Sequence, residues 1–350
     1  MGINLGLPPQ FKVAIVKWAE QDSLTETLGD ELMRMGYEVD CFLSTDPIPE
    51  AADLVFCFGP YDRWTQVVSQ AAQRKPRTGI KILHWNTENP PDLRLPWKFL
   101  TALGDMRAAF DRYNDSKNSQ TRRLVTSFPL SILNQKMHKY RYLGEYRHAQ
   151  ASGWLDLLAS SSKIYADLFT QHGLPTRYVP WGTSPKWFAP LGLQRDIDVL
   201  WFGKRRTTRR NRQLRRIHDK LSLKNISMYV ADNIEHSFIY REERMRFLNR
   251  AKITLNLLPT WYDNAFPYRF HVAAGNRSMV ISEPILSHCP EYHPGVHYIS
   301  APPEKLVDTI RYYLDHQDER EQIAENAYRL VTEQMTMENS VRLLVGLLQA

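Results

Sequence analysis

Residues 261–284, WYDNAFPYRFHVAAGNRSMVISEP, are the stretch that decides the fold of this chain. Their pattern predicts a loop, then a short helix of small residues opened by Arg269, and then a buried strand. An apolar run at 253–258 leads into this stretch and stops at Pro259. Small residues let a ligand approach the backbone at a helix start, so the stretch is a candidate binding wall.

Segments typical of strands and helices alternate on both sides of this stretch. In the second half of the chain we expect strands at 197–202, 226–230 and 253–257, and helices at 209–221 and 241–250. In the first half we expect strands at 11–18, 37–43, 54–58 and 80–85, and helices at 23–36 and 61–75. Alternation of this kind favours parallel strands joined by right-handed crossovers. The predicted fold class is therefore α/β, with two Rossmann-like doubly wound halves.

A proline-containing segment near residue 190 is the expected linker between two domains. We expect an N-terminal Rossmann-like domain at 1–185, a C-terminal Rossmann-like domain at 186–335, and a last helix at 336–350 that could pack back on the first domain. A central cleft is expected between the carboxyl ends of the two sheets, because ligands bind there in open parallel sheets. The pattern is weaker from residue 90 to about 150, where an insertion with substrate contacts and an irregular surface segment both fit.

Composition limits the class of protein. With 350 residues, of which 43% are hydrophobic and 24% charged, the chain can fill about two domain cores and is not a disordered protein. It contains no run of about 18 apolar residues and no secretory signal, so we expect no membrane span. Its three cysteines, Cys41, Cys57 and Cys289, lack metal-ligand spacing and are expected to be reduced thiols. These features favour a cytoplasmic protein.

A basic cluster accounts for the net charge of the chain. Between Lys204 and Arg216 there are eight Lys or Arg residues and no acidic one, against a formal net charge of +7 for all residues. The rest of the chain is therefore close to neutral, which favours an anionic ligand at one place. The residues at the expected strand end have the composition of a diphosphate-binding loop; they are Gly203, Lys204, Arg205 and Arg206. The later arginines could instead form a solvated helix face; they are Arg209, Arg210, Arg212, Arg215 and Arg216.

Several motifs occur in the order found in nucleotide-sugar glycosyltransferases of the GT-B fold, and the chain most resembles the CgeB-type (spore-maturation) enzymes. The motifs lie at about 197–334 and are DVLWFGKRR, ITLNLL, RFHVAAGNRSMVISEP, PGVHYIS and YRLVTEQ. A looser resemblance to phage DNA β-glucosyltransferases covers KILHWNTE, GKRRTTRRNR and YDN followed by RFHVAAGN. The resemblance implies transfer of a sugar from a nucleotide diphosphate, with UDP as the expected nucleotide, to a hydroxyl acceptor.

The same resemblance places the donor nucleotide on the stretch quoted first. Arg269 is expected to face a phosphate or the ribose, and Gly275 lies on the same expected helix. Many relatives have a ribose-binding glutamate shortly after this arginine, and this chain has none there. His271 or Glu283 could take its place, although capping and packing roles also suffice for a histidine at a helix start.

The acceptor chemistry is expected on the loop after the strand at 80–85. An inverting transfer needs a general base for the acceptor hydroxyl, and Glu88 ends KILHWNTE where the phage DNA glucosyltransferases have an aspartate. Asp92 is the second candidate for this catalytic role. The other acceptor-side candidates are His84, Asn86 and Glu20. In a retaining transfer, His84 or the backbone at 274–276 would matter more than a base at Glu88.

No motif requires a tightly bound cofactor or a divalent metal. His288, His293 and His297 are separated by prolines and a glycine, and no CxxC, HExxH, Walker or GxGxxG motif occurs. The expected partners are a nucleotide-sugar donor and a hydroxyl acceptor, whether a small molecule, a glycan or modified DNA.

The alternative function is a nucleic-acid-directed protein, either a DNA-modifying glucosyltransferase or a non-catalytic binding module. In that hypothesis the segment 137–148 follows a phosphate backbone and stacks bases on Tyr140, Tyr142 and Tyr146. The direction of the arginines separates the two functions. Convergence of Arg205, Arg206 and Arg269 on one pocket favours a diphosphate, whereas a basic face of about 20 Å favours nucleic acid.

Overall fold

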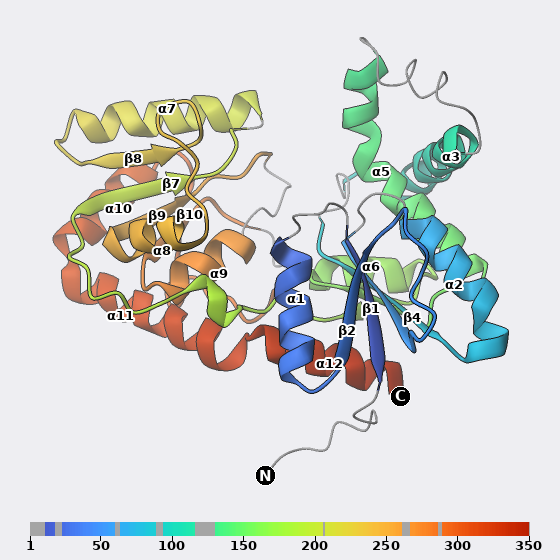
Figure 1. Ribbon diagram of the computed structural model, residues 1–350. Helices are drawn as coiled ribbons and strands as arrows, with labels where there is room; N and C mark the ends of the chain where they lie inside the picture. The colour runs from blue at the N-terminus through green and yellow to red at the C-terminus, as the bar shows by residue number, and fades with distance from the viewer. Residues whose placement is uncertain are drawn as a thin grey trace. The chain divides into compact units, whose positions relative to one another are not determined.

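The computed structural model describes residues 11–17, 23–59, 64–88, 94–115, 130–205, 207–260, 267–285 and 289–349. Contacts between residues divide the chain into two units (Figure 1). The first unit comprises residues 1–179 together with 342–350, and the second comprises 180–341. Within the described ranges, no helix is long and apolar enough to cross a membrane.

The first unit is a parallel sheet with helices on its faces. Its elements are β1 (Lys12–Lys17), α1 (Ser23–Arg34), β2 (Glu38–Leu43), β3 (Leu54–Phe58), α2 (Trp64–Thr78), β4 (Lys81–Asn86), α3 (Trp97–Asp115), α5 (Leu130–Ala151), β5 (Leu157–Ser160), α6 (Lys163–Gln171) and β6 (Arg177–Tyr178). The strand order is β2-β1-β3-β4-β5-β6, and every pairing is parallel. The order reverses between β1 and β3, as in doubly wound folds. The prediction of parallel strands joined by helices is therefore confirmed for this half of the chain.

Alternate residues of each strand in this sheet face opposite helical layers. Ala14 and Val16 belong to the core cluster that also contains Val67 and Val68 of α2. A Cβ atom placed on Gly29 of α1 would lie 3.6 Å from the Ile15 side chain, so α1 covers the other face. The sheet is thus buried on both sides, which explains why its strands are nearly continuous apolar runs.

Residues 97–151 contain a helix pair where the sequence pattern is weak. Helices α3 and α5 cross where Gly104 meets Gly144, and a Cβ on Gly104 would lie 2.9 Å from the Tyr140 carbonyl oxygen. Small residues permit this close backbone approach. Tyr142 and Tyr146 are buried in the core of the first unit. The interpretation that these two tyrosines stack nucleic-acid bases is therefore wrong, because their rings are already packed inside.

The second unit is a second parallel sheet with its own helices. Its elements are a 3₁₀ turn (Pro185–Trp187), β7 (Ile197–Phe202), α7 (Thr208–Ser222), β8 (Met228–Ala231), α8 (Arg241–Arg250), β9 (Ala251–Asn256), α9 (Pro267–Gly275), β10 (Met279–Ser282), β11 (Ile299–Ser300), α10 (Leu306–Asp315), α11 (Gln317–Arg329), a π-helical turn (Leu330–Gln334) and α12 (Met337–Gln349), whose last residues join the first unit. The strand order is β11-β10-β9-β7-β8, and all the pairs are parallel. In Figure 1, α7 lies along one face of this sheet and α8 and α9 along the other.

The strand order of the second unit reverses between β7 and β9. Neighbouring crossover connections leave this point in opposite directions, and open parallel sheets commonly bind ligands at the carboxyl ends of the two strands at such a point. The loops that follow β7 and β9 begin at Gly203 and Leu257. Any ligand of this unit is therefore expected beside these two loops.

The chain crosses between the two units twice, after residues 179 and 341, and the nearby segments of the second unit are paired with each other. Thr183 and Thr336 form an isolated parallel bridge. The Met337 N–H donates to the Thr183 carbonyl oxygen at 2.9 Å, and Thr183 N–H donates to the Met335 carbonyl oxygen at 2.7 Å. Gly182 lies so close to the backbone of Thr336 that a side chain there would overlap it.

Candidate functional site

Arg269 lies at the switch point of the second sheet. It is the third residue of α9 rather than the first, and its side chain is 8% exposed. Nη2 donates to the Phe202 carbonyl oxygen at 2.9 Å, at the end of β7, and Nη1 donates to Asn256 Oδ1, at the end of β9. Arg269 thus places a positive charge between the carboxyl ends of the two strands where the order reverses.

Asn256 was not among the residues singled out from the sequence. Its side chain is fully buried, accepts from Arg269, and donates to Ser282 Oγ at 2.9 Å. A polar residue inside the apolar run ITLNLL is the signal that could have identified it, because a buried amide requires partners. The residue belongs to the site as the group that orients Arg269.

Gly203 and Lys204 directly follow β7, and Gly203 lies next to the Arg269 guanidinium. Gly203 has φ of +125°, which few L-residues adopt, and its N–H donates to the Ala231 carbonyl oxygen at 3.0 Å. The Lys204 side chain is exposed. It forms no ion pair with a carboxylate among the residues whose positions are described, so its ammonium can meet an anionic ligand.

Replacing Gly203 by alanine is expected to damage this loop in two ways. The positive φ becomes strained, at a cost of about 1–3 kcal/mol. The new Cβ would also lie 3.0 Å from Arg269 Nη2. We expect a lower unfolding free energy by urea titration and weaker binding of a diphosphate ligand, whereas Gly153→Ala, at a positive-φ glycine with open space around it, should affect stability alone. Equal ligand binding in both variants would contradict the placement of Gly203 in the site.

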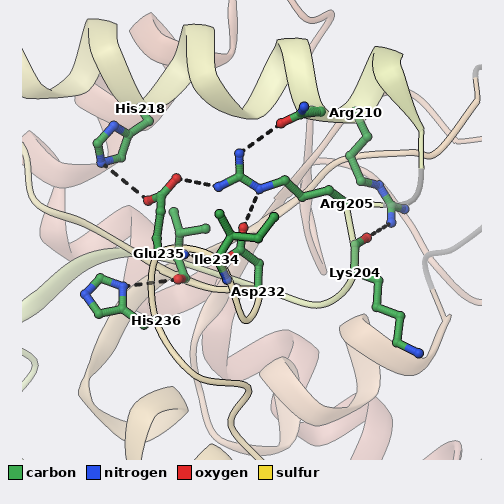
Figure 2. Close-up of polar contacts among 10 residues, drawn as sticks. Lys204, Arg205, Arg210, His218, Asp232, Ile234, Glu235 and His236 are labelled. Carbon is green, nitrogen blue, oxygen red and sulfur yellow. Dashed lines mark hydrogen bonds and ion pairs between the residues drawn. The ribbon is translucent and has the colours of Figure 1, made fainter.

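Arg205 points away from the switch point into a polar cluster of its own. Figure 2 shows its guanidinium between the loop after β8 and helix α7. Nε contacts Asp232, Nη2 lies 2.5 Å from Glu235 Oε1, and Nη1 donates to Asn211 Oδ1 at 2.9 Å. Arg205 is therefore occupied by two carboxylates, and it does not converge with Arg269 on one pocket.

Charges are balanced within the Arg205 cluster. Burial alone would raise the pKa of Asp232, but the Glu235 N–H and the Arg205 guanidinium outweigh it, so the pKa is below its ordinary value. Burial likewise opposes the charge of Arg205, while its bonds to Asp232 and Glu235 raise its pKa. Both groups are charged at neutral pH. The pair joins the loop after β7 to the loop after β8, and so fixes the backbone next to Lys204.

Arg205→Ala is expected to reduce stability, because it leaves the Asp232 carboxylate buried without its guanidinium. Asp232 has no exposed side-chain surface. Breaking such a pair costs on the order of 3–5 kcal/mol, measurable as a shift of the urea midpoint. The double variant Arg205→Ala/Asp232→Asn removes the stranded charge and should recover part of the loss. A double variant no more stable than Arg205→Ala would contradict the pairing.

Glu283 is held by Arg209 rather than left open to a ligand. Arg209 Nη2 lies 2.5 Å from Oε1 and Nη1 lies 3.1 Å from Oε2, a bidentate pair. Glu283 Oε2 also accepts the Leu258 N–H at 2.7 Å, and the carboxylate is buried. Arg210 is buried as well and donates to the Lys204 carbonyl oxygen at 2.9 Å. The interpretation of the later arginines as a solvated helix face is therefore wrong for Arg209 and Arg210.

Helix α7 begins beside the same strand ends. Thr207 caps it by accepting the Arg210 N–H at 3.2 Å, and its hydroxyl donates to the Pro259 carbonyl oxygen at 2.6 Å. The first turn of α7 therefore lies against the loop after β9, on the ligand side of the sheet. The N-terminus of the helix adds partial positive charge there.

His271 and Gly275 are packed inside the second unit. His271 Nδ1 contacts the Thr183 hydroxyl, and Nε2 lies 2.6 Å from the Tyr292 hydroxyl. Burial lowers the pKa of His271 to about 3, so the ring is neutral. Gly275 ends α9, where a Cβ would lie 3.0 Å from Phe188. These contacts favour structural roles, and a ribose contact for either residue stays a prediction.

The acceptor-side candidates that the structure describes cluster at the end of β4. Asn86 is buried; its Oδ1 accepts the Glu88 N–H at 3.1 Å, and its Nδ2 donates to the Glu88 carbonyl oxygen at 3.3 Å. These two bonds fix the loop, so Glu88 directly follows the carboxyl edge of the first sheet. Its partly exposed side chain has interactions of its own. Glu20, Asp92, Arg206 and residues 261–266 lie outside the described residues.

His84 is in the core rather than at the edge. It is fully buried, and the centroid of its ring lies 4.3 Å from that of Trp64 and 4.8 Å from that of Tyr146. Burial lowers its pKa to about 3 from an ordinary value of 6.5. An acceptor contact would require the aromatic cluster to open, so this geometry favours a packing role for His84.

The buried His84 predicts a specific pH dependence of stability. Because its folded-state pKa is depressed, the unfolded chain takes up a proton first, and stability is lost as pH falls from about 6.5 toward 3. At pH 5 the loss is on the order of 2 kcal/mol for one such histidine. We expect His84→Phe to reduce the difference in unfolding free energy between pH 7 and pH 5, with His271 supplying a similar remaining slope. An unchanged pH profile in His84→Phe would contradict its burial as the cause.

No three His, Cys, Asp or Glu side chains form a potential metal site within the ranges that the structure covers. The His293 N–H donates to His297 Nδ1 at 3.2 Å, so these two histidines organise a turn. His288 lies outside the described residues.

The described site combines a glycine-bearing loop, an exposed lysine, a strand-bridging arginine and a helix start. Sequence comparison finds that residues 204–346 match the family described as glycosyl transferase-like. This part of the chain is therefore similar to glycosyl transferases. The match begins at Lys204 and includes Arg269, so it contains most of the site just described. Among curated protein sequences, none matches the chain.

Solved structures with the same fold extend the likeness to both units. Sucrose-phosphate synthase from Thermosynechococcus elongatus matches with a TM-score of 0.55 and 13% identity, covering 95% of this chain and 97% of its own. Anabaena HepE in complex with UDP-glucose matches with a TM-score of 0.56 and 11% identity, covering 96% and 98%. An alpha-glucosyltransferase in complex with UDP and a 13-mer DNA matches with a TM-score of 0.53 and 9% identity, covering 93% and 96%.

These matches confirm the predicted fold class. Two doubly wound parallel sheets flanked by helices are the architecture of GT-B glycosyltransferases, and the described elements reproduce it. At 9–13% identity, what these structures show is the fold that the chain shares with them.

Proposed function

We propose that the protein transfers a sugar from a nucleotide-diphosphate sugar, with UDP as the nucleotide, to a hydroxyl acceptor. The observation that carries the proposal is the position of Arg269 and Lys204 at the switch point of the second sheet. Proteins of the same fold support the choice of nucleotide, because HepE was solved with UDP-glucose and with UDP. The finer likeness to CgeB-type enzymes and a cytoplasmic location remain predictions of the sequence.

The diphosphate is the part of the donor that this site suits best. As the bond between the sugar and the β-phosphate breaks, the β-phosphate of the departing UDP gains a second negative charge, which must be stabilised. In the proposed binding mode, the Lys204 ammonium and the first turn of α7 face the phosphates, and Arg269 adds positive charge at the ends of β7 and β9. Arg205 has a different role, since its two carboxylate partners already balance its charge.

The acceptor hydroxyl requires a base if the transfer inverts the anomeric centre. We propose Glu88 for this role, because the loop that holds it leaves the carboxyl end of β4 and is fixed by Asn86. Asp92 is the second candidate. The acceptor itself stays open between a small molecule, a glycan and modified DNA.

Titration calorimetry with UDP, UMP and uridine tests the donor site. A diphosphate site should bind UDP at least about tenfold more tightly than UMP, since the second phosphate adds charge-assisted hydrogen bonds. UDP-glucose should also raise the melting temperature by mass action. Equal binding of UDP and uridine, or no binding of any of the three, would remove the diphosphate from the switch point.

A further inference from the structure

Among the described arginines of the basic cluster at 204–216, one group is directed into the protein and another toward solvent. The inward group is used within the protein, because Arg205 and Arg209 are paired with carboxylates and Arg210 is buried. The outward group lies on the solvent side of α7. It consists of Arg212, Arg215, Arg216 and, one turn further on, Lys220, all of which are exposed.

Helical geometry arranges three of these cations in a line. Arg212, Arg216 and Lys220 are spaced four residues apart, so they form one ridge, with about 6 Å between neighbours and about 12 Å from end to end. Arg215 lies beside the ridge. We name the four residues the α7 basic ridge.

The positive charge of the α7 basic ridge is not neutralised by the surrounding protein. None of its four side chains forms an ion pair or hydrogen bond with another residue in the described part of the chain. The acid beside the ridge, Asp219, lies 3.8 Å from His218. Three residues of the ridge, Arg212, Arg215 and Arg216, belong to the segment 204–216, outside which the chain is close to neutral.

We propose that the α7 basic ridge binds the phosphodiester backbone of a nucleic acid. Phosphates recur every 3.4 Å along the axis of one strand, so a straight row of about 12 Å can meet three or four of them. Cations arranged in a line suit an extended polyanion, whereas a single phosphate or a metabolite requires groups that converge. The ridge offers no aromatic side chain for stacking, and the binding should therefore be independent of base sequence.

The buried face of α7 argues against an anionic membrane as the partner. A helix that binds a bilayer inserts its apolar side between the lipid headgroups. Here that side consists of Leu214, Ile217 and Leu221, which are packed in the core of the second unit. Helix α7 therefore exposes positive charge that could contact an anionic membrane, but it has no exposed apolar face that could insert into the bilayer.

Fluorescence anisotropy with a labelled 20-nucleotide single-stranded DNA, without any sugar donor, tests the proposal. The variant Arg212→Gln/Arg216→Gln removes two ridge charges, and Arg241→Gln/Arg246→Gln removes two exposed charges on α8 as its matched control. We expect the ridge variant to bind about tenfold more weakly at low salt, with the control within twofold of the parent protein. The slope of log K against log salt should fall by about 1–2 in the ridge variant alone.

Duplex DNA, single-stranded RNA and vesicles containing anionic lipid are the further probes. Binding of either nucleic acid with the same dependence on the ridge supports the proposal and shows which form is preferred. The proposal would be overturned if the two double variants lost DNA affinity equally, or if neither variant changed DNA affinity. It would also be overturned if vesicles bound through the ridge and nucleic acid did not. The single variant Arg216→Glu repeats the test with one exposed substitution, and circular dichroism of each variant establishes that it is folded.

Discussion

Glu88→Gln is expected to lower kcat by about 10²–10⁴ while leaving the affinity for UDP within about twofold. The substitution removes the proton-accepting oxygen but preserves side-chain shape. The loop should not move, because its hydrogen bonds to Asn86 run through the backbone of residue 88 rather than its side chain. Initial rates with UDP-glucose and the accepted hydroxyl substrate, together with calorimetry for UDP, separate the two quantities.

A parallel Asp92→Asn variant distinguishes the two candidate bases. If Glu88 is the base, the loss in kcat should be confined to Glu88→Gln, and its rate should lose the dependence on the ionisation of a carboxyl group. Full activity in Glu88→Gln would exclude this residue as the base. A loss of UDP affinity in that variant would instead assign Glu88 to donor binding.

Arg269→Ala is expected to weaken UDP binding by about 10- to 100-fold. The reason is that the variant loses a positive charge at the switch point. A hydrogen bond from a charged guanidinium to a phosphate of UDP would contribute about 1.5–3 kcal/mol to binding. The variant should also be less stable, since Asn256 Oδ1 and the Phe202 carbonyl oxygen lose their donor. Calorimetry on the folded protein measures the affinity, and urea titration measures the stability.

Arg269→Lys provides the control for charge alone. A lysine keeps the positive charge but cannot span both strand ends with a planar fork, so we expect intermediate UDP affinity. If Arg269→Lys and Arg269→Ala lost stability equally and both kept full UDP affinity, Arg269 would be a structural bridge and not part of the donor site.

The alternation of segments in the sequence was enough to predict the two sheets. Buried parallel strands are short continuous apolar runs, and ITLNLL and DVLWF have this pattern whatever surrounds them. The helix pair α3 and α5 could not be predicted in the same way, because its closest contact depends on Gly104 meeting Gly144. That meeting joins positions about forty residues apart and leaves little periodic signal in either segment.

The different roles of neighbouring residues in the basic loop could also not be predicted from the sequence. Lys204 and Arg205 are neighbours with similar charge, yet one is exposed and the other is enclosed by Asp232 and Glu235. The carboxylates that decide this difference come from the loop after the next strand, so only the folded sheet brings them together. The same holds for Glu283, whose partner Arg209 lies 74 positions earlier.

The pairing near Thr183 and Thr336 marks where the chain leaves the first unit and returns to it, and this return affects folding during translation. The first unit is discontinuous, since it takes up residues 342–350 only after the entire second unit has been synthesised. Arg342, in this late segment, interacts electrostatically with Tyr37 near the start of the chain. The half that is made first is therefore completed last. During translation, the first unit cannot form all of its contacts until α12 has been synthesised.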